Sequence, residues 1–130
     1  MPGKFCVSLT CAKDNPDKAT VAFVVANAAV ASDKEVVVFL STEAVRLAVQ
    51  GYADDIAEEG FATLKDLMTG FATLKDLMSG FASAGGKIYV CSPCFKRRKL
   101  DETNLVSGAV IVGGAKLVEF LGQGSPCVSY

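Results

Sequence analysis

Histidine and tryptophan are both absent from this chain of 130 residues. Without histidine, a Ser-His-Asp triad, a Cys-His nucleophile pair and a zinc site with a histidine ligand are all excluded. No window of 18 or more apolar residues is free of charge, so we expect no transmembrane helix. A net charge of -1 and a pI near 5.4 argue against a general nucleic-acid binder, which needs a basic surface. The five cysteines are therefore the first candidates for chemistry.

The length and composition are those of one globular domain, which we expect to span residues 1–130. The first five residues lack the basic-then-apolar layout of a signal peptide, so we expect a cytoplasmic protein. Thiols stay reduced in that compartment, and an odd number of cysteines favours free thiols over a disulfide framework.

Strand-like and helix-like segments alternate along the chain. Short apolar runs predict strands at 5–9, 36–40, 87–90, 109–112 and 127–130. Helical spacing and capping residues predict helices over 17–31, 42–50, 93–99 and 115–122. The uninterrupted run VVVFL at 36–40 is typical of a parallel strand that is buried on both faces. We therefore predict an α/β fold, a three-layer α/β/α sandwich around a mostly parallel sheet of about five strands.

A ten-residue tandem repeat occupies residues 60–79. Residues 60–68 read GFATLKDLM, and residues 70–78 read the same. Ten residues turn a helix by ~1000°, about 80° short of three full turns, so one continuous helix would rotate the second apolar stripe to another side. We expect the chain to bend near Gly70, to loop out one copy, or to bury the extra face elsewhere, with Phe71, Leu74, Leu77 and Met78 sharing one helical face. We interpret the repeat as a structural insertion, and the alternative is an amphipathic extension that faces a partner.

Cys91 and Cys94 form the most informative cysteine pair. Cys91 ends a predicted strand, Ser92 is a candidate N-cap, and Pro93 suits the first helical position. The helix N-terminus and the cations at 96–99 would stabilise a thiolate, which is the nucleophilic form of cysteine. The alternative is that both cysteines are ordinary, buried, small apolar residues.

The other three cysteines are weaker candidates. Cys11 follows the first predicted strand and would face the same sheet edge as Cys91, where it could resolve a disulfide or relay sulfur, although a packed loop thiol is the simpler interpretation. Cys6 and Cys127 are expected to be structural. A zinc site built from Cys6, Cys11, Cys91 and Cys94 is disfavoured because Cys6 lies within a strand rather than on a loop, so we expect no metal.

Two adjacent glycines, Gly113 and Gly114, follow the fourth predicted strand. They do not complete a dinucleotide-binding or P-loop glycine motif, so we expect no cofactor. We interpret them as positions where a helix packs closely on a strand.

The order and spacing of these segments resemble the DsrE/DsrF-like sulfur-relay family, which includes YchN-like and TusD-like proteins. The resemblance is carried by residues 5–9, 18–20, 36–40, 85–91 and 108–121. In sulfur-relaying members the acceptor cysteine follows a strand, six or seven residues before an arginine, and Cys91 followed by Arg97 and Arg98 resembles that arrangement. The resemblance implies that Cys91 accepts sulfane sulfur as a persulfide and passes it on. From their positions in the sequence, we expect Cys94 to act with Cys91, and Ser92, Arg97, Arg98 and Cys11 to support them. It also implies donor and acceptor proteins as partners, and a homotrimer or homohexamer.

Two other functions stay open. The Cys-Ser-Pro-Cys segment resembles the CxPC motif of thioredoxin-like proteins, which suggests a dithiol redox protein, but thioredoxins place that motif early and after a tryptophan. The apolar composition and the repeat also fit an oligomeric binding module without enzymatic activity.

Overall fold

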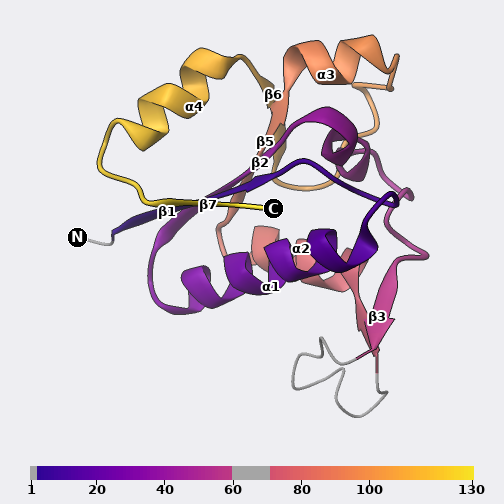
Figure 1. Cartoon of the computed structure of the whole chain (residues 1–130), viewed down its shortest axis with the longest axis horizontal. Coiled ribbons are helices and arrows are strands. Elements are labelled where there is room, and N and C mark those ends of the chain that lie inside the picture. Colours follow the sequence, from indigo (N-terminus) through magenta and orange to yellow (C-terminus); the bar gives the residue numbers. More distant parts are fainter. Residues whose placement is uncertain (1–2, 60–70) are drawn as a thin grey trace.

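The computed structural model describes residues 3–59 and 71–130, and its centre is a parallel sheet (Figure 1). Every pairing between neighbouring strands of this sheet is parallel. The strands lie in the order β6-β5-β2-β1-β7, with the bounds β1 (Lys4–Leu9), β2 (Glu35–Leu40), β5 (Lys87–Cys91), β6 (Ala109–Val112) and β7 (Cys127–Ser129). The predicted α/β fold with a five-stranded parallel sheet is confirmed.

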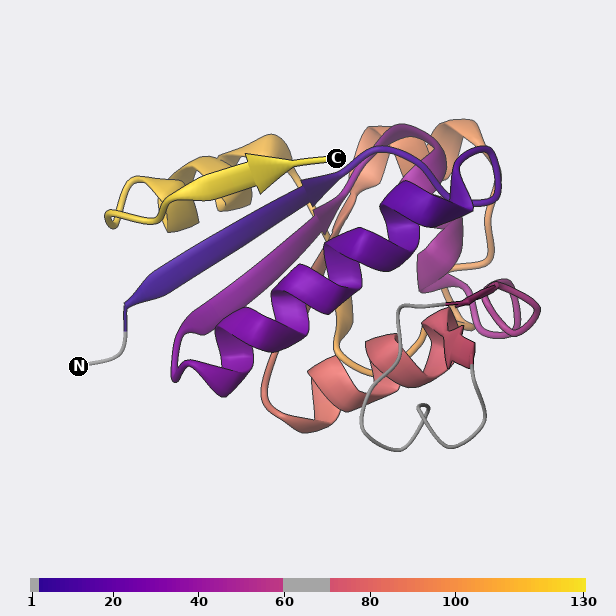
Figure 2. The same cartoon turned by 60° about the horizontal axis from the view of Figure 1, so that its bottom comes forward.

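Helices cover the two faces of the sheet unequally. One face carries α1 (Pro16–Ala31) and α2 (Leu74–Ser83), which lie side by side in Figure 2. The helix η1 (Thr42–Ala48) and the short helix α3 (Ser92–Arg97) pack against each other, and both contribute side chains to the core on that side. The other face carries α4 (Gly114–Leu121), of which Phe120 is the buried residue. None of the helices in the described part of the chain is long and apolar enough to cross a membrane.

Strand β2 is buried on both of its faces, as its apolar run predicts. Val36, Val38 and Leu40 belong to the main core beneath α1 and α2. Val37 and Phe39 point to the other face and pack with Phe120. Alternating residues of one strand therefore hold both outer layers of helices on the sheet.

Helices α1 and α2 are joined by a specific contact. The rings of Phe23 and Phe81 meet edge to face, with centroids 5.9 Å apart and planes at 75°. Asn27 Nδ2 donates a hydrogen bond to the carbonyl oxygen of Leu77 at 3.0 Å. Gly86 lies directly against this contact, because a Cβ atom there would be 2.3 Å from the Phe81 ring.

One predicted helix and the repeat differ from expectation. The predicted helix over 42–50 is the 3-10 helix η1, and two unpredicted strands, β3 (Ala57–Glu59) and β4 (Phe71–Thr73), pair in an antiparallel ladder. The prediction that Phe71 shares a helical face is wrong because Phe71 lies in β4, and the helix starts at Leu74, where the Thr73 hydroxyl accepts from the Asp76 N–H. Leu77 and Met78 are buried on α2 as expected. The first copy of the repeat and the bend at Gly70 fall outside the described residues.

The interpretation of the double glycine is also wrong. At Gly113 and Gly114, an added Cβ would meet no heavy atom of the described residues within 4 Å. Close packing of a helix on a strand therefore does not require glycine here. Gly113 is instead the N-cap of α4, with φ -89° and ψ 171°.

Candidate functional site at the carboxyl edge of the sheet

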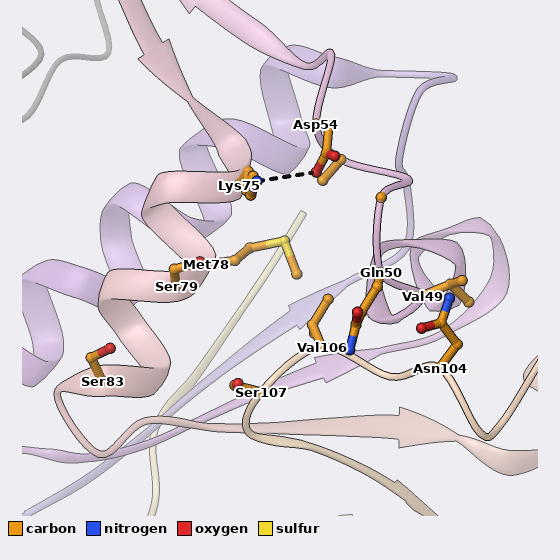
Figure 3. Close-up of a pocket in the computed structure, with 12 residues that line it drawn as sticks. Val49, Gln50, Asp54, Lys75, Met78, Ser79, Ser83, Asn104, Val106 and Ser107 are labelled. Atoms are coloured by element: carbon orange, nitrogen blue, oxygen red, sulfur yellow. Dashed lines mark ion pairs between the residues drawn. The ribbon is translucent and has the colours of Figure 1, made fainter.

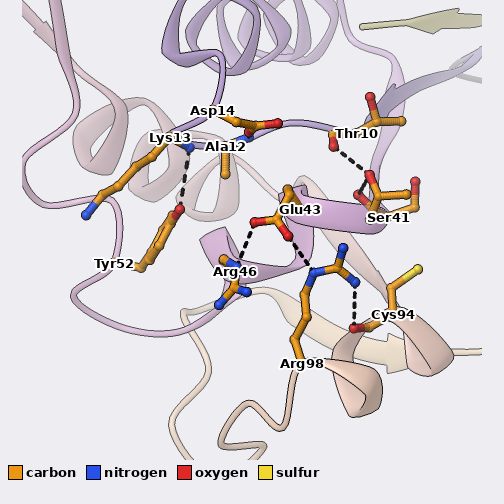
Figure 4. A network of polar contacts seen from close by, with 11 residues as sticks. Thr10, Ala12, Lys13, Asp14, Ser41, Glu43, Arg46, Tyr52, Cys94 and Arg98 are labelled. Carbon is orange, nitrogen blue, oxygen red and sulfur yellow. Dashed lines mark hydrogen bonds and ion pairs between the residues drawn. The ribbon is translucent and has the colours of Figure 1, made fainter.

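The carboxyl ends of β1, β2 and β5 meet at one edge of the sheet because the three strands are parallel. The chain leaves these strands through Thr10, Ser41 and Ser92, respectively. We call this region the carboxyl edge, and Figure 4 shows the polar contacts that connect its loops. It brings together residues that are far apart in the sequence.

Cys91 and Cys94, here called the edge pair, lie where β5 passes into α3. Both thiols are free and partly buried. Cys91 itself is the N-cap of α3, with φ -62° and ψ 115°, and makes no side-chain capping bond. The prediction that Ser92 caps the helix is therefore wrong by one position, since Ser92 is the first helical residue. The two thiols of the edge pair are near enough for each to influence the protonation of the other.

The pKa of the Cys91 thiol is raised above its ordinary value. Burial is the largest cause, and the neighbouring Cys94 thiol adds to it. The backbone N–H of Cys94 and the Arg98 guanidinium oppose this by stabilising the thiolate. The predicted net lowering by a helix N-terminus and nearby cations is therefore wrong in direction, because desolvation outweighs those contributions.

Arg98 connects the edge pair to η1. Its Nε donates to Glu43 Oε1 at 2.9 Å, and its Nη1 donates to the Cys94 carbonyl oxygen at 3.2 Å. The Nε of Arg46 donates to the other Glu43 oxygen at 2.8 Å, so one carboxylate holds two guanidinium groups. These hydrogen bonds lower the pKa of Glu43. Arg97, by contrast, is exposed, so Arg98 is the arginine that reaches the site.

Two strained backbone positions border this network. Thr42 and Lys99 adopt φ values of 50° and 53°, in the left-handed region that residues with a Cβ rarely occupy. Thr42 precedes Glu43 and donates from its hydroxyl to the Thr10 carbonyl oxygen at 2.6 Å. Lys99 follows Arg98 directly. Strain of this kind persists where the surrounding contacts enforce it, and it clusters at functional sites.

The other cysteines are not part of the edge pair. Cys11 follows β1 at the predicted edge, but it is only 7% exposed and belongs to the main core. Its burial, with the nearby Asp14 carboxylate, raises the pKa of its thiol. Cys6 and Cys127 lie opposite each other in β1 and β7. Within the described ranges, no three Cys, Asp or Glu side chains lie close enough together to hold a metal ion.

A cavity of about 660 Å³ is lined by other residues than the edge pair, and Figure 3 shows its lining. None of the five cysteines is among its lining residues. Its walls come from the loop after η1, from α2 and from residues 104–107, and an ion pair of Lys75 and Asp54 at 4.0 Å stands at one side. Lys75, Met78 and Ser79 belong to the second copy of the repeat, which therefore forms one wall of this cavity.

Sequence reasoning missed three residues of the site, namely Thr42, Glu43 and Arg46. The sequence alone places Glu43 in the first turn of the helix predicted over 42–50, where an acidic residue is ordinary. The available signal was its position just past the carboxyl end of β2, beside the strand that ends in Cys91. Its partner Arg98 lies 55 residues further along the chain, so the contact itself has no local pattern.

The fold and the site together define a class, an α/β protein that presents two neighbouring free thiols at the carboxyl edge of a parallel sheet. The chain belongs to the DsrE/DsrF-like family, whose sequence profile it matches over residues 3–129. The resemblance inferred from the sequence is thereby confirmed.

Individual relatives are distant. An uncharacterized protein of Methanocaldococcus jannaschii is 29% identical over 109 residues, which are 84% of this chain but 36% of that protein, so the chain spans about a third of this relative. The crystal structure of the YchN protein from E. coli superposes with a TM-score of 0.75 at 13% identity, covering 98% of this chain and 99% of YchN. A protein of unknown function from Methanobacterium thermoautotrophicum gives a TM-score of 0.68 at 10% identity, with 98% and 99% coverage. At these identities the structures support the fold alone.

Proposed function

We propose that this protein is a sulfur carrier of the sulfur-relay type, in which Cys91 holds sulfane sulfur as a persulfide. The observation that carries the proposal is the position of Cys91. Cys91 is the last residue of β5 at the carboxyl edge, and its thiol is partly buried. The Cys94 backbone N–H and the nearby Arg98 charge both lower the pKa of this thiol. Family membership supports sulfur relay as the general setting.

The transfer consists of two exchanges that conserve sulfur and electrons. The Cys91 thiolate attacks the outer sulfur of a donor persulfide, so a new S–S bond forms while the donor S–S bond breaks and the donor leaves as a thiolate. An acceptor thiolate then attacks that outer sulfur on Cys91 and takes it, which restores the Cys91 thiolate. The Cys91 sulfur is negatively charged before the first exchange and after the second. The Cys94 N–H and the Arg98 guanidinium stabilise this charge in both states.

The proposal includes partners and an assembly. Donor and acceptor proteins supply and remove the sulfur, and the chain works as a single domain within a homotrimer or homohexamer, as the family resemblance implies. A reducing cytoplasm suits this chemistry because it keeps the acceptor thiols and Cys91 free of disulfides.

The direct test is mass spectrometry of the intact chain after incubation with a small persulfide donor. Wild-type protein should gain one sulfur atom, which peptide mapping places on Cys91, and an added acceptor thiol should remove it. Cys91→Ser should gain none. Cys127→Ser should label like the wild type, because Cys127 is exposed on β7 and the strands β2 and β1 separate it from β5. Equal labelling of Cys91→Ser would exclude Cys91 as the carrier.

A dithiol redox function is the second candidate because the two thiols of the edge pair are neighbours at the junction of β5 and α3. In that case Cys91 and Cys94 would form a disulfide with a defined potential, and Cys94→Ser would abolish the activity. Sulfur relay by Cys91 alone predicts that Cys94→Ser still takes up sulfur. The labelling of this one variant therefore separates the two functions.

A further inference from the structure

Cys6 and Cys127, here called the strand pair, are a second pair of neighbouring thiols, at a place that sulfur relay does not use. They are register partners in the parallel strands β1 and β7, which run side by side in Figures 1 and 2. The Cys6 N–H donates to the Pro126 carbonyl oxygen at 3.0 Å, and the Tyr130 N–H donates to the Ser8 carbonyl oxygen at 2.8 Å, so hydrogen bonds hold both ends of this register.

The register places both side chains on the same face of the sheet. Register partners on neighbouring strands project to the same side, and neighbouring strands lie about 4.7–4.9 Å apart. That spacing falls within the roughly 4.4–6.8 Å between Cα atoms that a disulfide spans. The Cys127 Sγ lies 3.7 Å from the Val128 carbonyl oxygen, so a disulfide requires this thiol to turn from that contact towards Cys6. The backbone separation set by the register allows such a bond without a change in strand pairing.

The two thiols differ in their access to solvent. Cys6 is 0% exposed and packs among Val37, Phe39 and Phe120 beneath α4. Cys127 is exposed on the edge strand β7, which contradicts its expected packing role. An oxidant from solution therefore meets Cys127 first, and Cys6 is positioned to react only with Cys127.

We propose that the strand pair is a redox modification site, at which a low-molecular-weight disulfide oxidises Cys127 and Cys6 to an intramolecular disulfide. The Cys127 thiolate attacks the small disulfide, forming a mixed disulfide and releasing one small thiol. Cys6 then gives up its proton and attacks the Cys127 sulfur, which releases the second small thiol. Two protein thiols are oxidised and one small disulfide is reduced, so the electrons balance. The product ties the edge strand β7 covalently to β1.

The test uses the full chain with the edge pair removed, as Cys91→Ser/Cys94→Ser, so that Cys6, Cys11 and Cys127 are the remaining thiols. The protein is incubated with oxidised glutathione, its free thiols are blocked, and it is digested without reduction. We expect a Cys6–Cys127 linked peptide that disappears on reduction. The same link should form in the wild-type chain.

Two further variants assign the steps. Adding Cys127→Ser, a change at an exposed position that leaves the core intact, should abolish the link. Adding Cys6→Ala instead should trap glutathione on Cys127. A stable glutathione adduct on Cys127 with Cys6 still free in the parent variant, or a link from Cys6 to Cys11, would overturn the proposal. Either outcome leaves the sulfur-relay proposal intact because Cys91 is absent from the tested chain.

Discussion

At the scale of single residues, the reactivity of Cys91 depends on opposing effects in one small space. Burial raises the pKa of its thiol, and the Cys94 N–H and the Arg98 charge lower it. Glu43 determines where that charge lies, because its carboxylate binds both Arg98 and Arg46. Activation without histidine is therefore partial, and it relies on a hydrogen bond and on one fixed guanidinium group.

Replacing Arg98 by methionine should make Cys91 less reactive. Loss of the positive charge removes a contribution that lowers the thiol pKa, so a smaller fraction is thiolate at neutral pH. We expect alkylation of Cys91 by iodoacetamide, followed by peptide mass spectrometry over a range of pH, to be severalfold slower near neutrality. The rate should rise towards alkaline pH in both proteins, with the variant displaced to higher pH.

The matched control is Arg97→Met, which removes an equal charge from an exposed neighbouring position. Its alkylation profile should follow the wild type. If both variants slow Cys91 equally, the effect comes from general charge rather than from the Glu43–Arg98 contact.

At the scale of elements, Gly86 determines how closely α2 approaches β5. The turn between them brings this backbone against the Phe81 ring, whose other contact is Phe23 of α1. The β5 strand that follows ends in Cys91, so the packing of this turn also positions the candidate site. The packing of Gly86 against Phe81 therefore affects both the core and the position of Cys91 at the carboxyl edge.

Gly86→Ala should therefore destabilise the fold. Its Cβ would lie 2.3 Å from the Phe81 ring, which has to leave its edge-to-face contact. Overpacking of this kind costs about 1–3 kcal/mol of unfolding free energy, measurable by urea denaturation. Gly114→Ala is the control, since its Cβ meets open space and it is the first residue of α4 rather than the N-cap, and we expect it to stay within about 0.5 kcal/mol of the wild type.

Deleting residues 60–69 should leave the protein folded. The remaining copy still supplies Phe71–Ser83, and with it the capped helix α2 and its buried face. The β3–β4 ladder should be lost, because a single glycine would then separate Glu59 from Phe71, and a hairpin needs a loop of two residues or more.

Circular dichroism, thermal unfolding and size-exclusion chromatography check this deletion. Retained helix content and an unchanged oligomeric state would support a structural insertion. Loss of assembly with an intact monomer would contradict that interpretation and support a surface that faces a partner.

At the scale of the whole molecule, the free energy of unfolding depends on the buried thiols staying protonated. The pKa of Cys6 is raised from 9.0 to about 12, first by burial and then by the neighbouring Cys127 thiol. Burial also raises the pKa of Cys11 and Cys91. The folded chain therefore binds these protons more tightly than the unfolded chain does.

This difference predicts alkaline destabilisation. The contribution of Cys6 is fully present below about pH 9, the pKa of an unperturbed thiol, and is lost as the pH rises towards about 12. Under reducing conditions, the free energy of unfolding in urea should fall between about pH 9 and about pH 12. Cys6→Ala should show a shallower fall, and an equally steep fall in that variant would contradict the role of Cys6.

Much of the sheet could be predicted from local patterns. The run VVVFL at 36–40 predicts a strand that is buried on both faces. The observed β2 is this strand, one residue longer at its start. The hairpin of β3 and β4 could not be predicted in this way because each strand has three residues and gains its hydrogen bonds only from the other. The start of α3 lies one residue earlier than predicted because Cys91 is both the last residue of β5 and the N-cap of the helix.

By itself, the sequence determined which chemistry is available and where it lies along the chain. The lack of histidine leaves thiols as the candidate nucleophiles, and the alternation of strands and helices places Cys91 at the carboxyl edge of a parallel sheet. Only the tertiary structure decided which arginine reaches the site, which carboxylate holds it, and which thiols face each other across β1 and β7. The reason is that composition and periodicity are local properties, whereas burial, charge pairing and strand register depend on contacts between segments that are distant in the sequence.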